Sequence, residues 1–247
     1  MISKNQIKYI RQLEQKKYRK REGLFVAEGT KVVGDLLKHH EPKALYATDD
    51  WKAPAGISYT TVTDEELHRI SFQQNPQQVI GLFPIPPQNT IASFSNDLVL
   101  ALDGVQDPGN LGTIIRIADW FGIKTIVCSE DTADAWNPKV IQATMGSIAR
   151  VNIIYMSLLN LIDTLPSDFP VYGTLLDGEN IYTQSLSKEG LIIMGNEGNG
   201  ISEAVRTKVN RKLLIPDFHQ GETADSLNVA IATAITCSEF RRRQAIP

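Results

Sequence analysis

Three short polar segments hold the residue types that could carry out chemistry in this chain. They are residues 110–116 (Asn-Leu-Gly-Thr-Ile-Ile-Arg), 195–200 (Gly-Asn-Glu-Gly-Asn-Gly) and 226–229 (Ser-Leu-Asn-Val). Each lies where a strand is expected to end or a helix to begin. Their glycines let the backbone approach a ligand closely, and their polar side chains can orient it. Together they predict a cofactor site with one cationic residue, Arg116, beside it.

Each segment taken alone also has a purely structural interpretation. On a predicted helix over residues 111–121, Arg116 faces away from the apolar side and can pair with Asp119 at i+3, which contributes only roughly a few tenths of a kcal/mol. Asn110 suits the N-cap of that helix. Glu197 can be a solvated charge in a glycine-rich turn. The occurrence of three such turns, each closing a predicted strand, favours the functional interpretation.

The third segment is expected to open a long helix over residues 226–242. Ser226 or Asp225 suits its N-cap, and Asn228 lies in its first turn beside free backbone N–H groups. On the structural interpretation Leu227, Val229 and Ile231 are simply core residues, and they are expected to be core in either case.

The glycine pattern of residues 195–200 excludes two common nucleotide loops. Its order is Gly-x-x-Gly-x-Gly, whereas the dinucleotide fingerprint requires Gly-x-Gly-x-x-Gly. No Lys-Ser or Lys-Thr follows, as a P-loop requires. A nucleotide-binding oxidoreductase on an ordinary parallel sheet is therefore disfavoured.

The elements that position these segments are apolar runs with no polar alternation, as expected of strands covered on both faces. The runs are residues 98–102, 125–128, 151–154, 171–175, 191–194 and 213–215. Helical patterns lie between them, which predicts a parallel α/β sheet. Ligands bind such sheets at the carboxyl ends of the strands, where the loops 103–110, 195–200 and 216–225 lie.

The N-terminal part of the chain predicts a second, smaller α/β domain. Short strands are expected at residues 24–27, 44–47, 58–62 and 78–83, with helices at 31–38 and 64–70. The segment Pro84-Ile-Pro-Pro87 cannot continue a helix or a central strand, so the boundary is placed between residues 84 and 96. The predicted domains are residues 1–90 and 96–247.

Composition indicates a globular protein of the cytoplasm. The chain has 247 residues with 42% hydrophobic and 21% charged residues, no apolar run near the roughly 20 residues of a membrane helix, and no secretory signal at its start. Cys128 and Cys237 lie in apolar stretches, which indicates buried thiols in a reducing compartment. The four histidines are scattered, so no metal site and no membrane partner are expected.

The formal net charge is −3, but the positive charge gathers near the two ends. The run Lys16-Lys-Tyr-Arg-Lys-Arg21 is dense and contains an aromatic ring, which predicts contact with RNA. Neutralising Lys16, Lys17, Arg19 and Lys20 is expected to weaken RNA binding and flatten its salt dependence. Residues 241–243 (Arg-Arg-Arg) are interpreted instead as cations at a helix C-terminus.

Taken together, the motifs resemble the SpoU (TrmH-type) RNA 2′-O-ribose methyltransferases of the SPOUT superfamily. The matching pattern is Asn110-x-Gly-x-x-x-Arg116, then Gly195-x-Glu197-x-x-Gly200, then Ile215-Pro followed by Ser226-Leu-Asn-Val. Residues 25–29 (Phe-Val-Ala-Glu-Gly) and 76–79 (Pro-Gln-Gln-Val) match the small substrate-binding domain of that family. Residues 137–139 (Asn-Pro-Lys) with 144–147 (Thr-Met-Gly-Ser) match a further stretch.

The resemblance implies a trefoil-knotted parallel α/β methyltransferase domain that binds S-adenosylmethionine, in a homodimer whose subunits share each active site. It implies cofactor contacts from Thr174, Gly195, Ile215 and Leu227. It implies a catalytic neighbourhood of Asn110, Arg116, Glu197, Ser226 and Asn228, with Arg116 reaching the partner's cofactor.

The expected reaction is an in-line displacement, in which a ribose 2′-hydroxyl attacks the sulfonium methyl group. Negative charge develops on the attacking oxygen, and a guanidinium stabilises it. Because arginine does not deprotonate in proteins, Arg116 is assigned to orientation and charge stabilisation. The proton acceptor is left open among Glu197, a phosphate and water.

The favoured substrate is ribosomal RNA, because of the separate N-terminal domain. A tRNA 2′-O-methyltransferase and a non-catalytic RNA-binding protein are the alternatives. The chain also departs from the family pattern. The loop 216–226 is about three residues longer than usual, Gln142 stands where many relatives carry Arg, and Ala149 where an aromatic is common.

Overall fold

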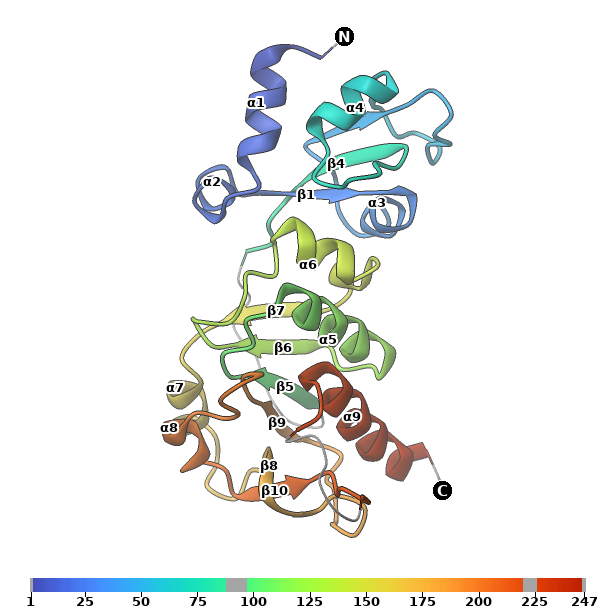
Figure 1. Cartoon of the computed structure of the whole chain (residues 1–247). Coiled ribbons are helices and arrows are strands. Elements are labelled where there is room, and N and C mark those ends of the chain that lie inside the picture. The colour runs from blue at the N-terminus through green and yellow to red at the C-terminus, as the bar shows by residue number, and fades with distance from the viewer. Residues whose placement is uncertain (1, 88–96, 220–225, 246–247) are drawn as a thin grey trace. The chain divides into compact units, whose positions relative to one another are not determined.

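The computed structural model describes residues 2–87, 97–219 and 226–245 (Figure 1). The contacts divide the chain into two compact units. The first comprises Met1–Pro87 with Asp134–Arg150, and the second comprises Gln88–Ala133 with Val151–Pro247. Residues 134–150 thus belong to the first unit by their contacts, although residues of the second unit precede and follow them in sequence.

The first unit is built on a four-stranded sheet of order β1-β4-β2-β3. Its strands are β1 (Leu24–Glu28), β2 (Ala44–Ala47), β3 (Thr60–Thr61) and β4 (Val79–Pro84). β4 pairs antiparallel with β1 and β2, whereas β3 is parallel to β2. The strand expected at 58–62 is only two residues long, because both threonines of this edge are exposed and nothing buries them.

Helices complete the first unit. They are α1 (Lys4–Gln12), α2 (Lys16–Glu22), α3 (Thr30–Leu36), α4 (Asp64–Ile70), α6 (Pro138–Ala143) and the 3₁₀ turn η1 (Ser147–Ala149). The prediction for α4 is confirmed at both ends. Its start is set by a capping box, in which the Thr63 hydroxyl accepts from the Glu66 amide and the Glu66 carboxylate accepts from the Thr63 amide.

The second unit is a six-stranded parallel sheet of order β10-β8-β9-β5-β6-β7, which confirms the predicted fold class. The strands are β5 (Leu98–Leu102), β6 (Thr125–Cys128), β7 (Asn152–Tyr155), β8 (Val171–Asn180), β9 (Gly190–Met194) and β10 (Arg211–Leu214). β5 and β9 end level with each other, since Leu102 pairs with Met194. The loops after them therefore begin side by side.

Helices cover both faces of this sheet. They are α5 (Pro108–Trp120), α7 (Leu158–Asp163), α8 (Glu203–Arg206) and α9 (Val229–Ala245). Figure 1 shows α5 and α9 next to each other on one side and α7 and α8 on the other, and each pair is in contact. Cys128 and Cys237 are fully buried as predicted, and burial raises the pKa of the Cys237 thiol to about 12.

Among the described residues no helix is both long enough and apolar enough to cross a membrane.

Candidate functional site: a glycine-lined hollow at the ends of β8, β9 and β10

Helix α5 begins earlier than the sequence predicts, and this changes the role of Asn110. Asp107 is the N-cap: its Oδ1 accepts from the Asn110 amide at 2.7 Å, and Pro108 occupies the first helical position. The prediction that Asn110 caps the helix is therefore wrong. Asn110 lies in the first turn, and its side chain is free to bond elsewhere.

A chain of hydrogen bonds joins the three predicted segments. Asn228 Nδ2 donates to Asn110 Oδ1 at 2.9 Å, and Asn110 Nδ2 donates to Glu197 Oε1 at 3.1 Å. The structure thus brings together residues 118 and 87 positions apart in sequence. We call these three side chains the polar clamp, because they tie together the loops after β5 and β9 and the start of α9.

Glu197 is the acceptor end of the polar clamp. Besides Asn110, its carboxylate accepts from the backbone amides of Gln106 and Asp107, each at 3.1 Å. Partial burial raises the pKa of Glu197, but the hydrogen bonds from the Asn110 side chain and from the backbone outweigh it, so the pKa lies below its usual value. At neutral pH the Glu197 carboxylate is an anion that accepts three hydrogen bonds.

Helix α9 begins at Val229 rather than at residue 226. Asn228 is its N-cap, since Asn228 Oδ1 accepts from the amides of Ala230 at 2.9 Å and Ile231 at 3.3 Å. The prediction that the helix starts at Ser226 is wrong, and Asp225, the other predicted cap, lies outside the described residues. Ser226 and Leu227 consequently precede the helix as an exposed turn.

The loop 195–200 folds tightly back on itself after β9. Asn196 and Gly200 exchange backbone hydrogen bonds of 2.9 and 3.0 Å, and Gly200 has a φ of +68°. A Cβ on Gly195 would lie 2.2 Å from the carbonyl carbon of Gly200, so only glycine fits there. Asn196 Nδ2 also donates to the carbonyl of Gly104 at 2.6 Å, which fixes this loop to the one after β5.

These loops enclose a hollow of about 390 Å³ at the carboxyl ends of β8, β9 and β10. The four residues expected at the cofactor, Thr174, Gly195, Ile215 and Leu227, all line it. Two of the five residues expected in the catalytic neighbourhood, Glu197 and Ser226, line it as well. The Thr174 hydroxyl donates to the Ile193 carbonyl at 3.3 Å. The hollow therefore has apolar walls and a floor of close-packed backbone.

Sequence reasoning missed other wall residues, notably Leu176 and Arg206. Leu176 lies on β8 beyond residue 175, where the predicted strand stops, and its 74% exposure marks it as an apolar side chain facing open space. Arg206 Nη2 lies 2.5 Å from Asp177 Oδ2, so this cation on the wall is already paired. No signal in the sequence marks Leu176, because its exposure is visible only in the folded chain.

Arg116 does not line the hollow of its own chain. It projects from α5 as an exposed side chain, on the side of the helix opposite the buried Leu111, Ile114 and Ile115. Trp120, one turn further along α5, is 85% exposed, and Ile231 on the neighbouring α9 is 52% exposed. Arg116 thus lies on the open surface of the second unit. Leu227 is 51% and Ile231 52% exposed, so the expectation that both are core residues is wrong.

The basic run of the first unit forms α2, and one of its members is not available to RNA. Arg19 is 2% exposed: its Nη2 lies 2.5 Å from Asp134 Oδ2, and its Nη1 donates to the Leu13 carbonyl at 2.8 Å. The prediction that Arg19 belongs to an RNA-contacting surface is therefore wrong, because a buried, paired guanidinium cannot reach a phosphate. The lysines of the run, Lys16, Lys17 and Lys20, are exposed.

The three arginines near the end of α9 lie at a helix C-terminus, as predicted, but they bond to groups of the same chain instead of forming only a solvated face. Arg241 Nε donates to the Phe121 carbonyl at 2.7 Å, Arg242 pairs with Glu239 at 2.8 Å, and Arg243 pairs with the same carboxylate at 2.9 Å.

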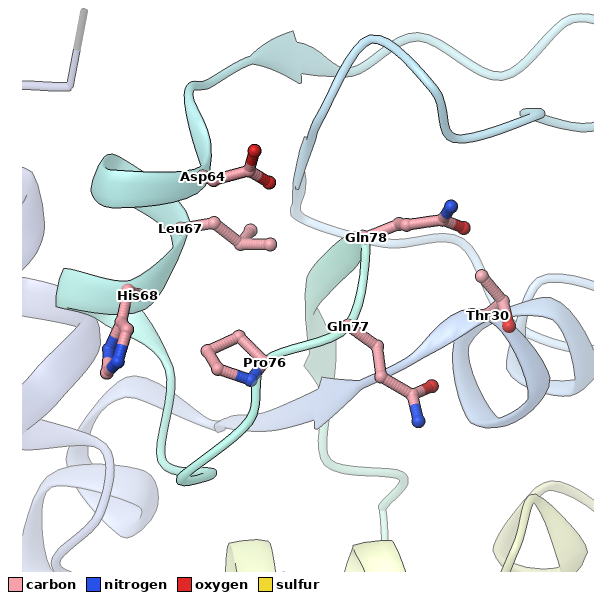
Figure 2. A pocket seen from close by; sticks show the side chains of 7 residues that line it. All are labelled: Thr30, Asp64, Leu67, His68, Pro76, Gln77 and Gln78. Atoms are coloured by element: carbon pink, nitrogen blue, oxygen red, sulfur yellow. The ribbon is translucent and has the colours of Figure 1, made fainter.

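The segment Pro76-Gln-Gln78 borders a separate hollow of about 340 Å³ in the first unit. Figure 2 shows Gln77 and Gln78 across from Asp64 and His68 of α4. Gln78 Nε2 donates to Asp50 Oδ2 at 2.7 Å. The nearby carboxylates make this hollow unsuited to a phosphate backbone. Within the described ranges, no group of three His, Cys, Asp or Glu side chains could hold a metal ion.

Both parts of the chain match known protein families. Residues 97–238 match the model of the SpoU rRNA Methylase family, and residues 4–81 match the MRM3-like substrate binding domain. The chain is 32% identical to "23S rRNA (guanosine(2553)-2'-O)-methyltransferase RlmP" of Bacillus subtilis, over 97% of both chains.

Solved structures of RNA methyltransferases are similar to this chain over nearly its whole length. A putative RNA methyltransferase of the TrmH family from Porphyromonas gingivalis is 40% identical, with a TM-score of 0.87 over 98% of this chain and 99% of that one. An AdoMet-bound rRNA methyltransferase from Sinorhizobium meliloti is 31% identical, with a TM-score of 0.85 over 98% and 96%.

Proposed function

Because the chain belongs to the SpoU rRNA methylase family, we propose that it transfers a methyl group from S-adenosylmethionine to a ribose 2′-hydroxyl of ribosomal RNA. A guanosine of 23S rRNA is the first candidate target, after the name of the Bacillus subtilis relative. The observation that carries the proposal is the hollow at the ends of β8, β9 and β10, with all four expected cofactor residues on its wall. Family membership also implies the trefoil knot. A cytoplasmic location is part of the proposal, after the bacterial relative.

The residues present fit the cofactor. The clash that any Cβ on Gly195 would meet with the backbone of Gly200 shows that this turn closes only with glycine, and the turn forms a backbone cradle on the wall of the hollow. Apolar walls from Ile215 and Leu227 suit an adenine ring, while backbone groups of the same loops supply polar contacts. When bound, S-adenosylmethionine supplies an activated methyl group in line with the attacking 2′-hydroxyl.

The polar clamp has a positioning role in this proposal. It holds the loop of Gly195 and the turn of Leu227 at fixed places, so that both walls of the hollow are preorganised. Glu197 is assigned to positioning rather than to proton acceptance, because its carboxylate already accepts from three donors and its pKa is lowered. The proton of the hydroxyl therefore goes to water or to a phosphate of the RNA.

Arg116 completes the site of a second copy of the chain. It is exposed on α5 but lies off the wall of its own hollow, and the exposed Trp120 and Ile231 on α5 and α9 provide an apolar face for dimerisation. From the partner, the Arg116 guanidinium stabilises the developing charge on the ribose oxygen.

The test is tritiated methyl transfer to rRNA that lacks the modification. Incorporation resistant to alkali is expected with wild type and with Arg211→Ala, an exposed arginine of β10 away from the proposed interface. Arg116→Ala is expected to abolish incorporation while leaving S-adenosylmethionine binding to the chain measurable. No incorporation by wild type, despite cofactor binding, would instead support a non-catalytic RNA-binding protein; incorporation into tRNA alone would change the substrate.

Sharing of the site has its own test. Arg116→Ala and Gly195→Val are each expected to be inactive alone, because one lacks the cation and the other the cradle. Mixing the two after partial unfolding and refolding is expected to restore activity, since the hybrid dimer has one complete site. A mixture that stays inactive while hybrid dimers form would refute a shared site.

A further inference from the structure

A second hollow in the first unit contains a buried carboxylate that methyl transfer does not use. It encloses about 330 Å³ within β1, the residues after α4, and α6, and its wall is mostly apolar. Glu28, the last residue of β1, lines it and is only 4% exposed. A buried carboxylate costs free energy unless donors surround it, so its presence on an apolar wall calls for a reason.

The hydrogen bonds of Glu28 hold it in place but do not saturate it. Its Oε2 accepts from the Ser71 hydroxyl, and its Oε1 accepts from the Phe72 amide at 2.7 Å. An ionised carboxylate offers about four acceptor sites, so roughly two remain for a ligand in the hollow. Burial raises the pKa of Glu28, against the hydrogen bonds from Ser71 and Phe72, and further N–H donors from a ligand would favour the ionised form.

The rest of the wall suits a flat aromatic ligand on a phosphate chain. Phe72 is half-buried and lines the hollow, and the Arg11 guanidinium lies 4.8 Å from the centroid of its ring. Gln73 Nε2 donates to Gln142 Oε1 at 2.9 Å, which fixes two further amides on the wall. Lys139 of α6 is exposed on the lining, where its ammonium can meet a phosphate.

We propose that this hollow takes one unstacked guanine base of the RNA substrate, at a nucleotide other than the methylated one, with the base edge on Glu28 and the ring beside Phe72. Guanine presents two adjacent donors, N1–H and the N2 amino group, to an acceptor-only carboxylate. Adenine and cytosine place a lone pair beside their amino group, and uracil flanks its single N–H with carbonyl oxygens, so each would set an acceptor against Glu28. The inference rests on the proposed function, because it assumes an RNA substrate.

The experiment uses the full-length protein and a transcript of the 23S rRNA region that the wild type methylates. Inosine, which lacks the N2 amino group, replaces guanosine at random positions, and bound and unbound RNA are compared by sequencing. We expect inosine at one unpaired guanosine to weaken binding by about 10-fold, the effect of losing one well-placed base contact. Glu28→Gln should bind unsubstituted RNA about 10-fold more weakly and lose the discrimination against inosine.

The control is Gln77→Ala, which changes the hollow bordered by residues 76–78 in the same unit and should keep both the affinity and the inosine effect. S-adenosylmethionine affinity and the melting temperature should match wild type in all variants. If Glu28→Gln does not fold, Phe72→Leu, which removes the stacking ring but stays apolar, and the inosine series on wild type decide the question.

Two outcomes are distinguishable. If wild type methylates the transcript but shows no inosine effect outside the target, or if Glu28→Gln and Phe72→Leu bind like wild type, the guanine pocket is refuted and the methyltransferase stands. If wild type neither binds nor methylates any RNA, the proposed function itself fails.

Discussion

Replacing Glu197 with glutamine separates a positioning role from a proton-accepting role. The wild-type carboxylate accepts three hydrogen bonds of 3.1 Å, from the amides of Gln106 and Asp107 and from Asn110 Nδ2. Glutamine has the same shape but only one oxygen, so its NH₂ group must face at least one of these donors. At least one of the three hydrogen bonds is lost, and the remaining ones become weaker because their acceptor is no longer charged.

The size of the effect follows from ordinary hydrogen-bond energies. A bond to a charged group contributes about 1.5–3 kcal/mol and a neutral bond about 1 kcal/mol. Glu197 is exposed enough for solvent to screen its charge, so the lower end of the range applies. A total loss of about 1.5 kcal/mol in the polar clamp corresponds to roughly a 10-fold weaker affinity for S-adenosylmethionine.

Two measurements check Glu197→Gln: calorimetric titration with S-adenosylmethionine, and kcat with both substrates saturating. We expect the dissociation constant to rise about 10-fold and kcat to fall by less than that. The lowered pKa of Glu197 means that its contribution is present above the usual carboxyl range and is lost only as pH falls through the lowered value. Unchanged cofactor affinity with a kcat reduced at least 100-fold, and an acidic limb missing from the pH profile, would refute the positioning role.

Three further substitutions test the packing around the two units. Gly195→Ala should weaken S-adenosylmethionine binding by about 10- to 100-fold in calorimetry, because its Cβ would lie 2.2 Å from the Gly200 carbonyl carbon; wild-type affinity would contradict the cradle. Arg19→Met should lower the free energy of unfolding in urea by about 3–5 kcal/mol, since it leaves the Asp134 charge without its buried partner; a loss below about 1 kcal/mol would show the pair to be dispensable. Burial opposes ionisation of Asp35, but Lys31 and Lys38 outweigh it and lower its pKa to about 2. Asp35→Asn should therefore lower the free energy of unfolding by roughly 2 kcal/mol at pH 7, and the difference from wild type should vanish as pH falls from about 3.8 to 2. A difference in unfolding free energy that does not depend on pH would contradict the ion-pair origin.

Strands β5 and β6 of the parallel sheet could be predicted from the sequence, because apolar runs and the polar residues that follow them mark where each strand ends. β5 and β6 match the predicted runs 98–102 and 125–128 at both ends, since every residue between those limits is apolar or threonine and polar residues follow. β8 could not be predicted beyond residue 175. Its last five residues are largely polar, and they extend only because β10 pairs with them across a register shift at Lys212 and Leu213. That pairing depends on a segment some thirty residues away in the chain.

The starts of the helices at the site show what local patterns leave undetermined. Both Asp107 and Asn110 are good cap residues, and the apolar pattern of α5 fits either start. The choice is made by tertiary contacts, because Asn110 gains Glu197 and Asn228 as partners only when Asp107 caps the helix. The burial of Arg19 could not be predicted for the same reason. A basic run predicts a solvated helix face, but Arg19 is buried because it pairs with Asp134, which lies 115 residues away in the sequence.

The position of Arg116 relative to the hollow is the reason for proposing that one chain holds half of a catalytic site. Methyl transfer to a hydroxyl requires charge stabilisation at the ribose oxygen, next to the cofactor. Among the described residues, the cation on the wall of the hollow is Arg206, and its guanidinium is held by Asp177. Arg116 has the required charge but does not line the hollow of its own chain, and Trp120, one turn further along α5, is 85% exposed. In the proposed dimer, a second copy on the exposed surface of α5 would bury the tryptophan and exchange the arginines, and the polar clamp would fix the hollow against which each arginine acts.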